Sequence, residues 1–206
     1  MNQILEKVSN RSGGPLQRAV SEAIIRAARE ELAEQGFARF SIENVARRAG
    51  VGKAALYRRW PSKEAMLIWL LQGAGVDYAK ARDTGSLRGD LEAYVASVAE
   101  VFSEPTTARI AAHLYGELAT NSIFAKLIRE TVQPLKNEPV RGLLSRAASR
   151  GEIPEDLNVS LAYDLLLGSL YWRLVMLRRE LEQDEVSQLA AMLEAALRRH
   201  KPEAGV

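Results

Sequence analysis

Apolar residues recur at helical spacing along almost the whole chain. In residues 16–35, Val20, Ile24 and Leu32 mark one face of a helix, and Gly36 is placed to end it. Sustained alternation with a period of two, runs of β-branched residues and Asn-Gly hairpin signals are missing from the sequence. The pattern therefore predicts an all-α protein of about nine helices.

Capping residues, glycines and prolines divide the rest of the pattern. Pro134 and Pro139 should kink or split one long helix, because proline removes a backbone donor and clashes with the preceding turn. Another helix is apolar nearly all round, which predicts burial on more than one side. The predicted helices after the first span residues 41–49, 53–59, 62–81, 87–102, 106–120, 122–150, 158–178 and 184–200.

Two residue types on which much enzyme chemistry depends are scarce. The 206 residues include no cysteine and two histidines, His113 and His200. This composition excludes disulfides, thiolate nucleophiles, iron–sulfur clusters and multi-histidine metal sites. The sequence also lacks a G-x-S-x-G motif and a phosphate-binding glycine loop. We therefore expect no enzyme activity, no metal and no cofactor.

Charge is distributed unevenly. Residues 1–72 hold twelve basic and seven acidic residues, a net charge of +5, whereas the other 134 residues hold sixteen basic and nineteen acidic ones. A basic N-terminal third suggests that one end of the molecule meets a polyanion. Random scatter of charge is the alternative at this point.

No feature of the sequence predicts a membrane or secretory destination. The first fifteen residues carry charges and no long apolar run. The most apolar stretch, residues 157–177, contains Asp164 and Arg173, and a charge near a bilayer centre costs several kcal/mol. We expect a cytoplasmic protein without membrane contact.

The segment most informative about function is SIENVARRAGVGKAALYRRW, residues 41–60. Val45 and Ala46 lie on the inner face of its first helix, Leu56 and Trp60 on that of the second, and Gly50 permits a tight reversal between them. This is the pattern of a helix-turn-helix, whose second helix enters the major groove of double-stranded DNA. A helical hairpin with a solvated basic face has the same spacing. The outward residues of the second helix are Lys53, Ala54, Ala55, Tyr57, Arg58 and Arg59.

Residues 23–70 resemble the DNA-binding region of the TetR (tetracycline-repressor-like) family. The resemblance implies a helix-turn-helix DNA-binding domain (16–61) and a helical body (62–206) that binds ligand and dimerises. The residues before them (1–15), which close with Gly13-Gly14-Pro15, are expected to form a flexible arm. The markers are Ala27-Ala28, Gly36-Phe37, Ser41-Ile42, Val45-Ala46, Ala49-Gly50-Val51, Leu56-Tyr57, Trp60 and Ser62-Lys63-Glu64.

The resemblance also assigns DNA contacts by position. Ser41 matches a residue that meets phosphate, Lys53 and Ala55 match residues that meet base edges, and Tyr57 and Arg59 match residues that hold the DNA backbone. Short side chains such as those of Ala54 and Ala55 let the helix approach the bases.

Other positions near this motif are less settled. Lys63 matches a phosphate contact at the start of the fourth helix, and Gly52 departs from the Ser or Thr common in the family. Glu43 is a solvated helix residue unless it accepts from a cytosine amine. Arg47 and Arg48 either touch phosphate or belong to solvated surface.

The last two predicted helices are the candidates for a dimer interface. The resemblance implies a four-helix bundle made from these helices and their symmetry mates, and the apolarity of residues 158–178 calls for a partner. A two-fold homodimer would bind a palindromic operator with half-sites about 34–36 Å apart, or a multiple of this. The candidate interface residues are Leu161, Leu165, Gly168, Ser169, Trp172, Leu189, Leu193, Ala196 and Leu197.

An effector pocket is a weaker inference, since residues of each of these types are more often part of the core than of a pocket. His113 is the best polar candidate, with a hydrogen-bonded core histidine as the alternative. Asp164 and Arg173 could pair between subunits, or one could line a cavity. The candidate ligand-binding residues are Trp69, Tyr94, Phe102, His113, Tyr115, Phe124, Tyr163, Tyr171 and Trp172.

These observations predict a sequence-specific transcriptional regulator, a repressor released from its operator by an unidentified small molecule. A non-sequence-specific architectural DNA-binding protein is one alternative, and a measurable specificity ratio would exclude it. An enzyme that uses the helical body is the other, and the motifs offer it little support.

Overall fold

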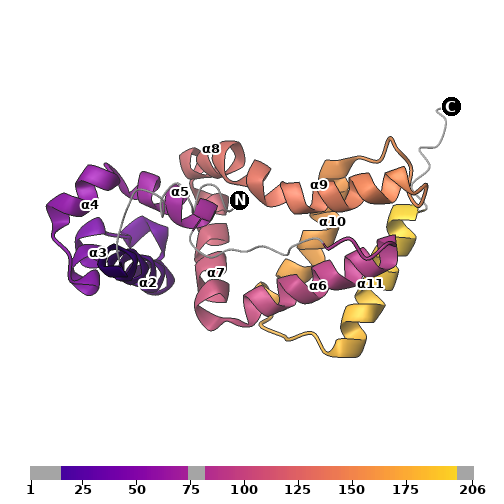
Figure 1. Ribbon diagram of the computed structural model, residues 1–206, viewed down its shortest axis with the longest axis horizontal. Helices are drawn as coiled ribbons and strands as arrows, with labels where there is room; N and C mark the ends of the chain where they lie inside the picture. The colour runs from indigo at the N-terminus through magenta and orange to yellow at the C-terminus, as the bar shows by residue number, and fades with distance from the viewer. Residues whose placement is uncertain (1–14, 74–81, 199–206) are drawn as a thin grey trace. The chain divides into compact units, whose positions relative to one another are not determined.

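The computed structural model describes residues 15–73 and 82–198. These ranges contain ten α-helices, one π-helical turn and no strand, so the prediction of an all-α fold is confirmed (Figure 1). The elements are α2 (Pro15–Arg39), α3 (Ile42–Ala49), α4 (Lys53–Arg59), α5 (Lys63–Gly73), α6 (Leu87–Ser103), α7 (Pro105–Thr120), α8 (Ser122–Thr131), α9 (Gln133–Ser149), α10 (Val159–Tyr171), the π-helical turn η1 (Trp172–Met176) and α11 (Gln183–Arg198).

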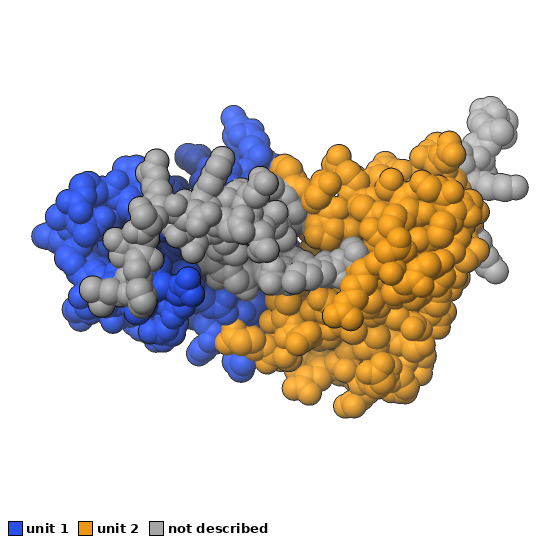
Figure 2. Space-filling view, in the orientation of Figure 1, with its two compact units in different colours: residues 1–76, 105–133 blue, residues 77–104, 134–206 orange. Residues whose placement is uncertain are grey.

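The chain forms two compact units, coloured separately in Figure 2. Within the described residues, the first unit consists of residues 15–73 and 105–133, and the second consists of residues 82–104 and 134–198. The first unit therefore holds α2–α5 together with α7 and α8. It includes more of the chain than the helix-turn-helix segment 16–61, because two helices from later in the sequence pack into it.

Helix α2 is the central element of the first unit and packs against α3, α5 and α7. Its regular geometry breaks at Gly36, which has φ 67° and ψ 172°. An L-residue with a side chain is disfavoured there, and an added Cβ would also lie 3.1 Å from His113 Nδ1 on α7. The helix break that the sequence predicts at Gly36 is therefore confirmed.

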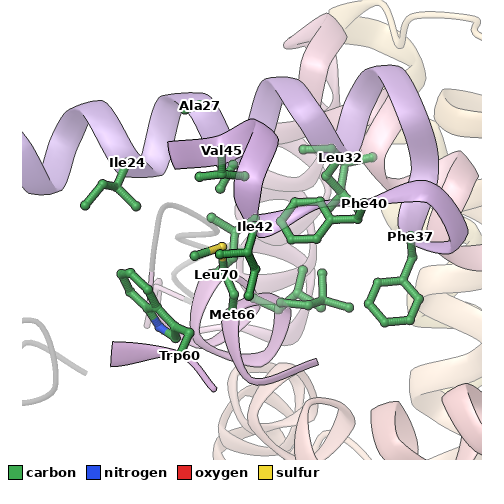
Figure 3. Packing of buried hydrophobic residues seen from close by; sticks show 14 of the residues in the cluster. Ile24, Ala27, Leu32, Phe37, Phe40, Ile42, Val45, Trp60, Met66 and Leu70 are labelled. Atoms are coloured by element: carbon green, nitrogen blue, oxygen red, sulfur yellow. The ribbon is translucent and has the colours of Figure 1, made fainter. Parts of the chain in front are cut away.

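The core of the first unit joins residues that are far apart in the sequence. Figure 3 shows Leu32 and Phe40 on the same side of the cluster as Met66 and Leu70, with Ile24 above Trp60 at its edge. Helices α7 and α8 extend this core, and the Phe124 ring stacks on Phe37 with centroids 4.5 Å apart. Burial of such side chains contributes roughly 1.5–3 kcal/mol each, so α7 and α8 stabilise the surface that carries α3 and α4.

The second unit has its own core, made by α6, α9, α10 and α11. Helix α6 packs along α11 and also touches α10 and η1. Leu91, Leu143 and Leu166 are fully buried in this core. Along α10 and η1 the opposite face is exposed, and the exposed fractions are 60% at Leu161, 44% at Leu165 and 59% at Trp172. Among the residues that the structure describes, those of the same chain cover one side of this apolar helix and leave the other exposed.

Several predicted boundaries need correction. The helix expected over 122–150 is split at Val132, before Pro134, whereas Pro139 lies inside α9 without ending it. The helix expected over 158–178 leaves α-geometry at Trp172 and continues as η1. The helix expected over 62–81 is seen to Gly73, and its remainder lies outside the described residues, as do the predicted arm (1–15) up to residue 14, and His200. Among the described helices, none is long and apolar enough to cross a membrane.

Candidate nucleic-acid interface

The geometry of α3 and α4 is set by their caps. The Ser41 Oγ accepts a hydrogen bond from the Asn44 N–H at 3.3 Å, which begins α3. Gly50 ends α3 in the left-handed conformation with φ 68°, and the Val51 N–H donates to the Ala46 carbonyl at 3.0 Å. Helix α4 then begins after Gly52 without a side-chain cap, as the departure at Gly52 predicts.

The two faces of α4 differ as the sequence predicts. Leu56 is buried together with Trp60, the residue that follows α4, and both pack into the core with Val45 and Ala46 of α3. The opposite face carries cations, a phenol and short side chains, a combination that suits phosphates and base edges. Its exposed residues are Lys53, Ala54, Ala55, Tyr57, Arg58 and Arg59.

Arg59 is held at the end of α4 by two indole rings. Its guanidinium carbon lies 4.5 Å from the Trp60 ring centroid and 5.4 Å from that of Trp69. These contacts are within the range of cation–π attraction. Burial lowers the pKa of Arg59, yet an arginine stays charged near neutral pH. The charge at this position is therefore oriented before any ligand arrives.

Lys63 has a structural role that the sequence did not reveal. Its ammonium donates to the Phe37 carbonyl at 3.1 Å and to the Ala38 carbonyl at 3.0 Å, and lies 4.6 Å from the Phe37 ring centroid. The side chain thus fastens the start of α5 to the end of α2. The phosphate contact expected of Lys63 would have to be made alongside these bonds.

The two adjacent arginines of α3, Arg47 and Arg48, have different hydrogen-bond partners. Arg48 donates to Glu34 Oε1 at 3.1 Å, and its Nε lies 3.2 Å from the carboxylate of Glu31, which is fully buried. Glu31 also accepts from the Asn44 side chain at 2.8 Å. Arg48 therefore ties α3 to α2, whereas exposed Arg47 donates to Asn44 Oδ1 at 2.9 Å. Of the two, Arg47 is the better candidate for a phosphate contact.

Glu43 is exposed, as its interpretation as a solvated helix residue predicts, but it is also hydrogen-bonded on both carboxylate oxygens. It accepts from the Tyr57 hydroxyl at 2.6 Å and from the Ser41 hydroxyl at 3.0 Å. The bond from Tyr57 is the main cause that lowers the pKa of Glu43, and the same bond raises the pKa of Tyr57. Glu43 is therefore ionised at neutral pH. Sequence spacing did not reveal this contact, because it depends on how α4 crosses α3.

The nine candidate ligand-binding residues are divided between the two units. Trp69 and Phe124 pack against the core of the first unit, and Tyr94 and Tyr163 are buried in the core of the second. The others are half-buried or exposed, and their role as ligand contacts stays a prediction. The first unit holds Trp69, His113, Tyr115 and Phe124, and the second holds Tyr94, Phe102, Tyr163, Tyr171 and Trp172.

The structure shows the surroundings of three polar residues whose roles the sequence leaves undecided. His113 is exposed on α7 beside Gly36, so its interpretation as a core histidine is wrong. Arg173 pairs with Glu185 of the same chain and donates to the Glu180 carbonyl at 3.3 Å. Asp164 is exposed on α10. The structure thus gives Arg173 a partner within its own subunit.

The predicted dimer residues also fall into two groups. Leu161, Leu165 and Trp172 are exposed on α10 and η1, as an interface requires, whereas Leu193 and Leu197 of α11 are only 3% and 2% exposed. These two leucines fill the core of their own chain. Exposed apolar positions in this part of the chain that the sequence prediction missed are Met176, Leu177 and Met192, with exposed fractions of 55%, 46% and 67%.

Sequence models of known families match both units. A model described as "Bacterial regulatory proteins, tetR family" matches residues 24–69, and one described as "Tetracyclin repressor-like, C-terminal domain" matches residues 81–193, more than half of the chain. This chain belongs to the TetR family. It is a helix-turn-helix DNA-binding regulator of transcription, as the resemblance of residues 23–70 implies.

Individual proteins of known sequence or structure are similar to most of the chain. An HTH-type transcriptional regulator of Mycobacterium tuberculosis strain H37Rv is 31% identical over 160 residues, 77% of each chain. The crystal structure of the TetR family transcription regulator SCO0332 is 30% identical, with a TM-score of 0.66 over 85% of this chain and 97% of that one. FadR from Bacillus subtilis, crystallised in complex with stearoyl-CoA, shares the fold with 20% identity and a TM-score of 0.67 over 87% and 98% of the two chains.

Proposed function

We propose that this chain is an effector-responsive repressor that binds a palindromic operator as a homodimer. The observation that carries the proposal is the exposed face of α4, which presents cations and short side chains on a helix whose other face is locked into the core. A helix fixed in this way can dock into a major groove without losing conformational entropy, because it is already ordered in the free protein.

Each exposed residue of α4 has a role that its side chain suits. Lys53 donates to base acceptors, and the short Ala54 and Ala55 let the helix backbone approach the bases. Tyr57 and Arg58 reach the DNA backbone, as does Arg59 from its position on the indole rings. Ser41 and Lys63 add phosphate contacts from the start of α3 and of α5.

The exposed apolar face of α10 and η1 supports a homodimer. It contains Leu161, Leu165, Trp172 and Met176, and Met192 of α11 adds a further apolar side chain. Gly168, exposed on α10, allows a second helix to approach closely. A two-fold pair of these faces would give the dimer two copies of α4, which matches the symmetry of a palindrome.

Effector control requires two states with different affinity for the effector. Binding in the helical body (62–206) would favour a state in which the two copies of α4 no longer fit successive grooves, and the operator would be released. The FadR relative, crystallised with stearoyl-CoA, supports a small-molecule effector in this fold. The absence of cysteine and the cytoplasmic setting expected from the sequence agree with such a regulator.

Selection of random duplex DNA by the purified full-length protein tests this function. We expect an enriched palindrome whose half-sites lie about 34–36 Å apart, or a multiple of this, and a dimer on it. Binding without an enriched sequence, weakening steeply with salt, would instead identify an architectural DNA-binding protein. Repeating the selection after unfolding and refolding removes any effector carried through purification.

A further inference from the structure

The carboxylate of Glu43 contacts residues of the proposed DNA-binding surface. Its Oε1 accepts from the Tyr57 hydroxyl at 2.6 Å, and its Oε2 accepts from the Ser41 hydroxyl at 3.0 Å. Lys53 also interacts electrostatically with it. Three of the residues proposed to contact DNA are therefore engaged, in the free protein, by one negative charge.

A hydroxyl that donates to Glu43 cannot donate to DNA phosphate at the same time. A serine or tyrosine hydroxyl has one proton and can donate one hydrogen bond. If Tyr57 or Ser41 donates to a phosphate oxygen, it must stop donating to Glu43. Moreover, the phosphate and the Glu43 carboxylate are both negatively charged. They repel each other when a phosphate approaches the hydroxyls that Glu43 already contacts.

We propose that Glu43 is an internal competitor of DNA phosphate that lowers the affinity of this surface for any duplex. The inference rests on the proposed function, since it takes Ser41 and Tyr57 as phosphate contacts. Its effect is independent of base sequence, because the hydroxyls of Ser41 and Tyr57, for which Glu43 competes, carry no sequence information in a phosphate contact. Operator and unrelated DNA are therefore bound more weakly by the same factor, and the ratio of the two affinities is unchanged.

The test compares the full-length protein with its Glu43→Gln variant on two duplexes, the sequence that the wild type selects and a shuffled duplex of equal length. Glutamine keeps the side chain's size but removes the charge and weakens the acceptor. We expect dissociation constants about 3- to 10-fold lower on both duplexes, the range that one exposed hydrogen bond provides. Glu22→Gln removes one charge from an exposed position of α2 and should change binding less than about twofold.

A second variant shows whether the competition acts through Tyr57. A protein that carries Tyr57→Phe has no phenolic hydroxyl to donate to Glu43 or to a phosphate. The gain in DNA-binding affinity caused by Glu43→Gln should therefore be at most half as large in that protein. Circular-dichroism melts of each variant would confirm that all remain folded at the assay temperature. Equal gains with and without the Tyr57 hydroxyl would overturn the mechanism.

Other results of these binding measurements would contradict the inference about Glu43 or the operator proposal. Unchanged or weaker binding of Glu43→Gln on both duplexes would contradict the inference. A changed base at one selected position, without a general gain in affinity, would show that Glu43 contacts a base instead. If the wild type selects no sequence, the operator proposal fails, whereas the shuffled duplex still tests Glu43 by itself.

Discussion

Individual side chains of the helix-turn-helix divide into those that hold the fold and those that remain on its surface. Arg48 and Lys63 are cations near α4, yet both are bonded to α2, through Glu34 and the Phe37 carbonyl respectively. Lys53 is exposed on α4 without such bonds to the neighbouring helix among the described contacts. A count of positive charge therefore overstates the number of cations available to DNA.

Lys53 provides the prediction at the residue scale. Replacing Lys53 by alanine should relax the preference for one base pair in each half-site by about 1–3 kcal/mol, because a donor to base acceptors is lost. Selection experiments with both proteins would measure this. Lys126→Ala is the control, since Lys126 is an exposed cation on α8 with a side chain 69% exposed, and its variant should keep the wild-type preference. An unchanged preference in Lys53→Ala would contradict the assignment.

At the scale of elements, polar clusters fix where helices begin and end. The start of α6 is held by the buried carboxylate of Asp90, which accepts from the Thr84 N–H at 2.6 Å and from the Arg150 guanidinium at 3.1 Å. Arg150 follows α9, and it also donates to Glu152 Oε2 at 3.3 Å. This cluster joins α6 to the end of α9 within the second unit.

The Asp90 cluster predicts a pH-dependent stability. Burial by itself raises the pKa of Asp90, but hydrogen bonds from Thr84 and the pairing with Arg150 outweigh it and leave the pKa below the ordinary 3.8. The stabilisation is thus full above pH 3.8 and is lost as the pH falls below it through the folded-state pKa. We expect Asp90→Asn to lower the free energy of unfolding by about 1–3 kcal/mol at pH 7 and by less near pH 3.

Chemical denaturation across this pH range would measure the effect. Asp156→Asn, at an exposed position of the turn before α10, is the control and should unfold like the wild type at each pH. A loss of stability in Asp90→Asn that stays constant down to pH 3 would show that the carboxylate's charge is not its cause.

At the scale of the whole molecule, the proposed dimer depends on the uncovered apolar face of α10 and η1. Trp172 is 59% exposed there, so Trp172→Glu should leave each chain folded while placing a charge in the interface. We expect sedimentation to show a shift from dimer to monomer and weaker binding to a palindrome. Ile123→Glu, at a position of α8 that is 83% exposed, is the control and should remain a dimer. A dimeric Trp172→Glu protein would exclude this face.

The all-α class, most helix boundaries and the exposed face of α4 could be predicted from the sequence alone. These features depend on local chemistry: capping at Ser41, backbone freedom at Gly50, and the helical spacing of Leu56 and Trp60. The family, too, is evident from residues 24–69, where closely spaced positions carry the pattern.

Only the tertiary structure decided which side chains meet across helices. Glu43 meets Tyr57, Arg48 meets Glu34, and Phe124 stacks on Phe37, although their separations in sequence are 14, 14 and 87 residues. Likewise, Leu193 and Leu197 lie in the core of their own chain and not in an exposed interface. The sequence could not show this, because a helical stripe of apolar residues shows which face is apolar but not what covers that face. Periodicity is a property of one helix, whereas these contacts are set by how helices cross, and that is decided by the packing of the whole unit.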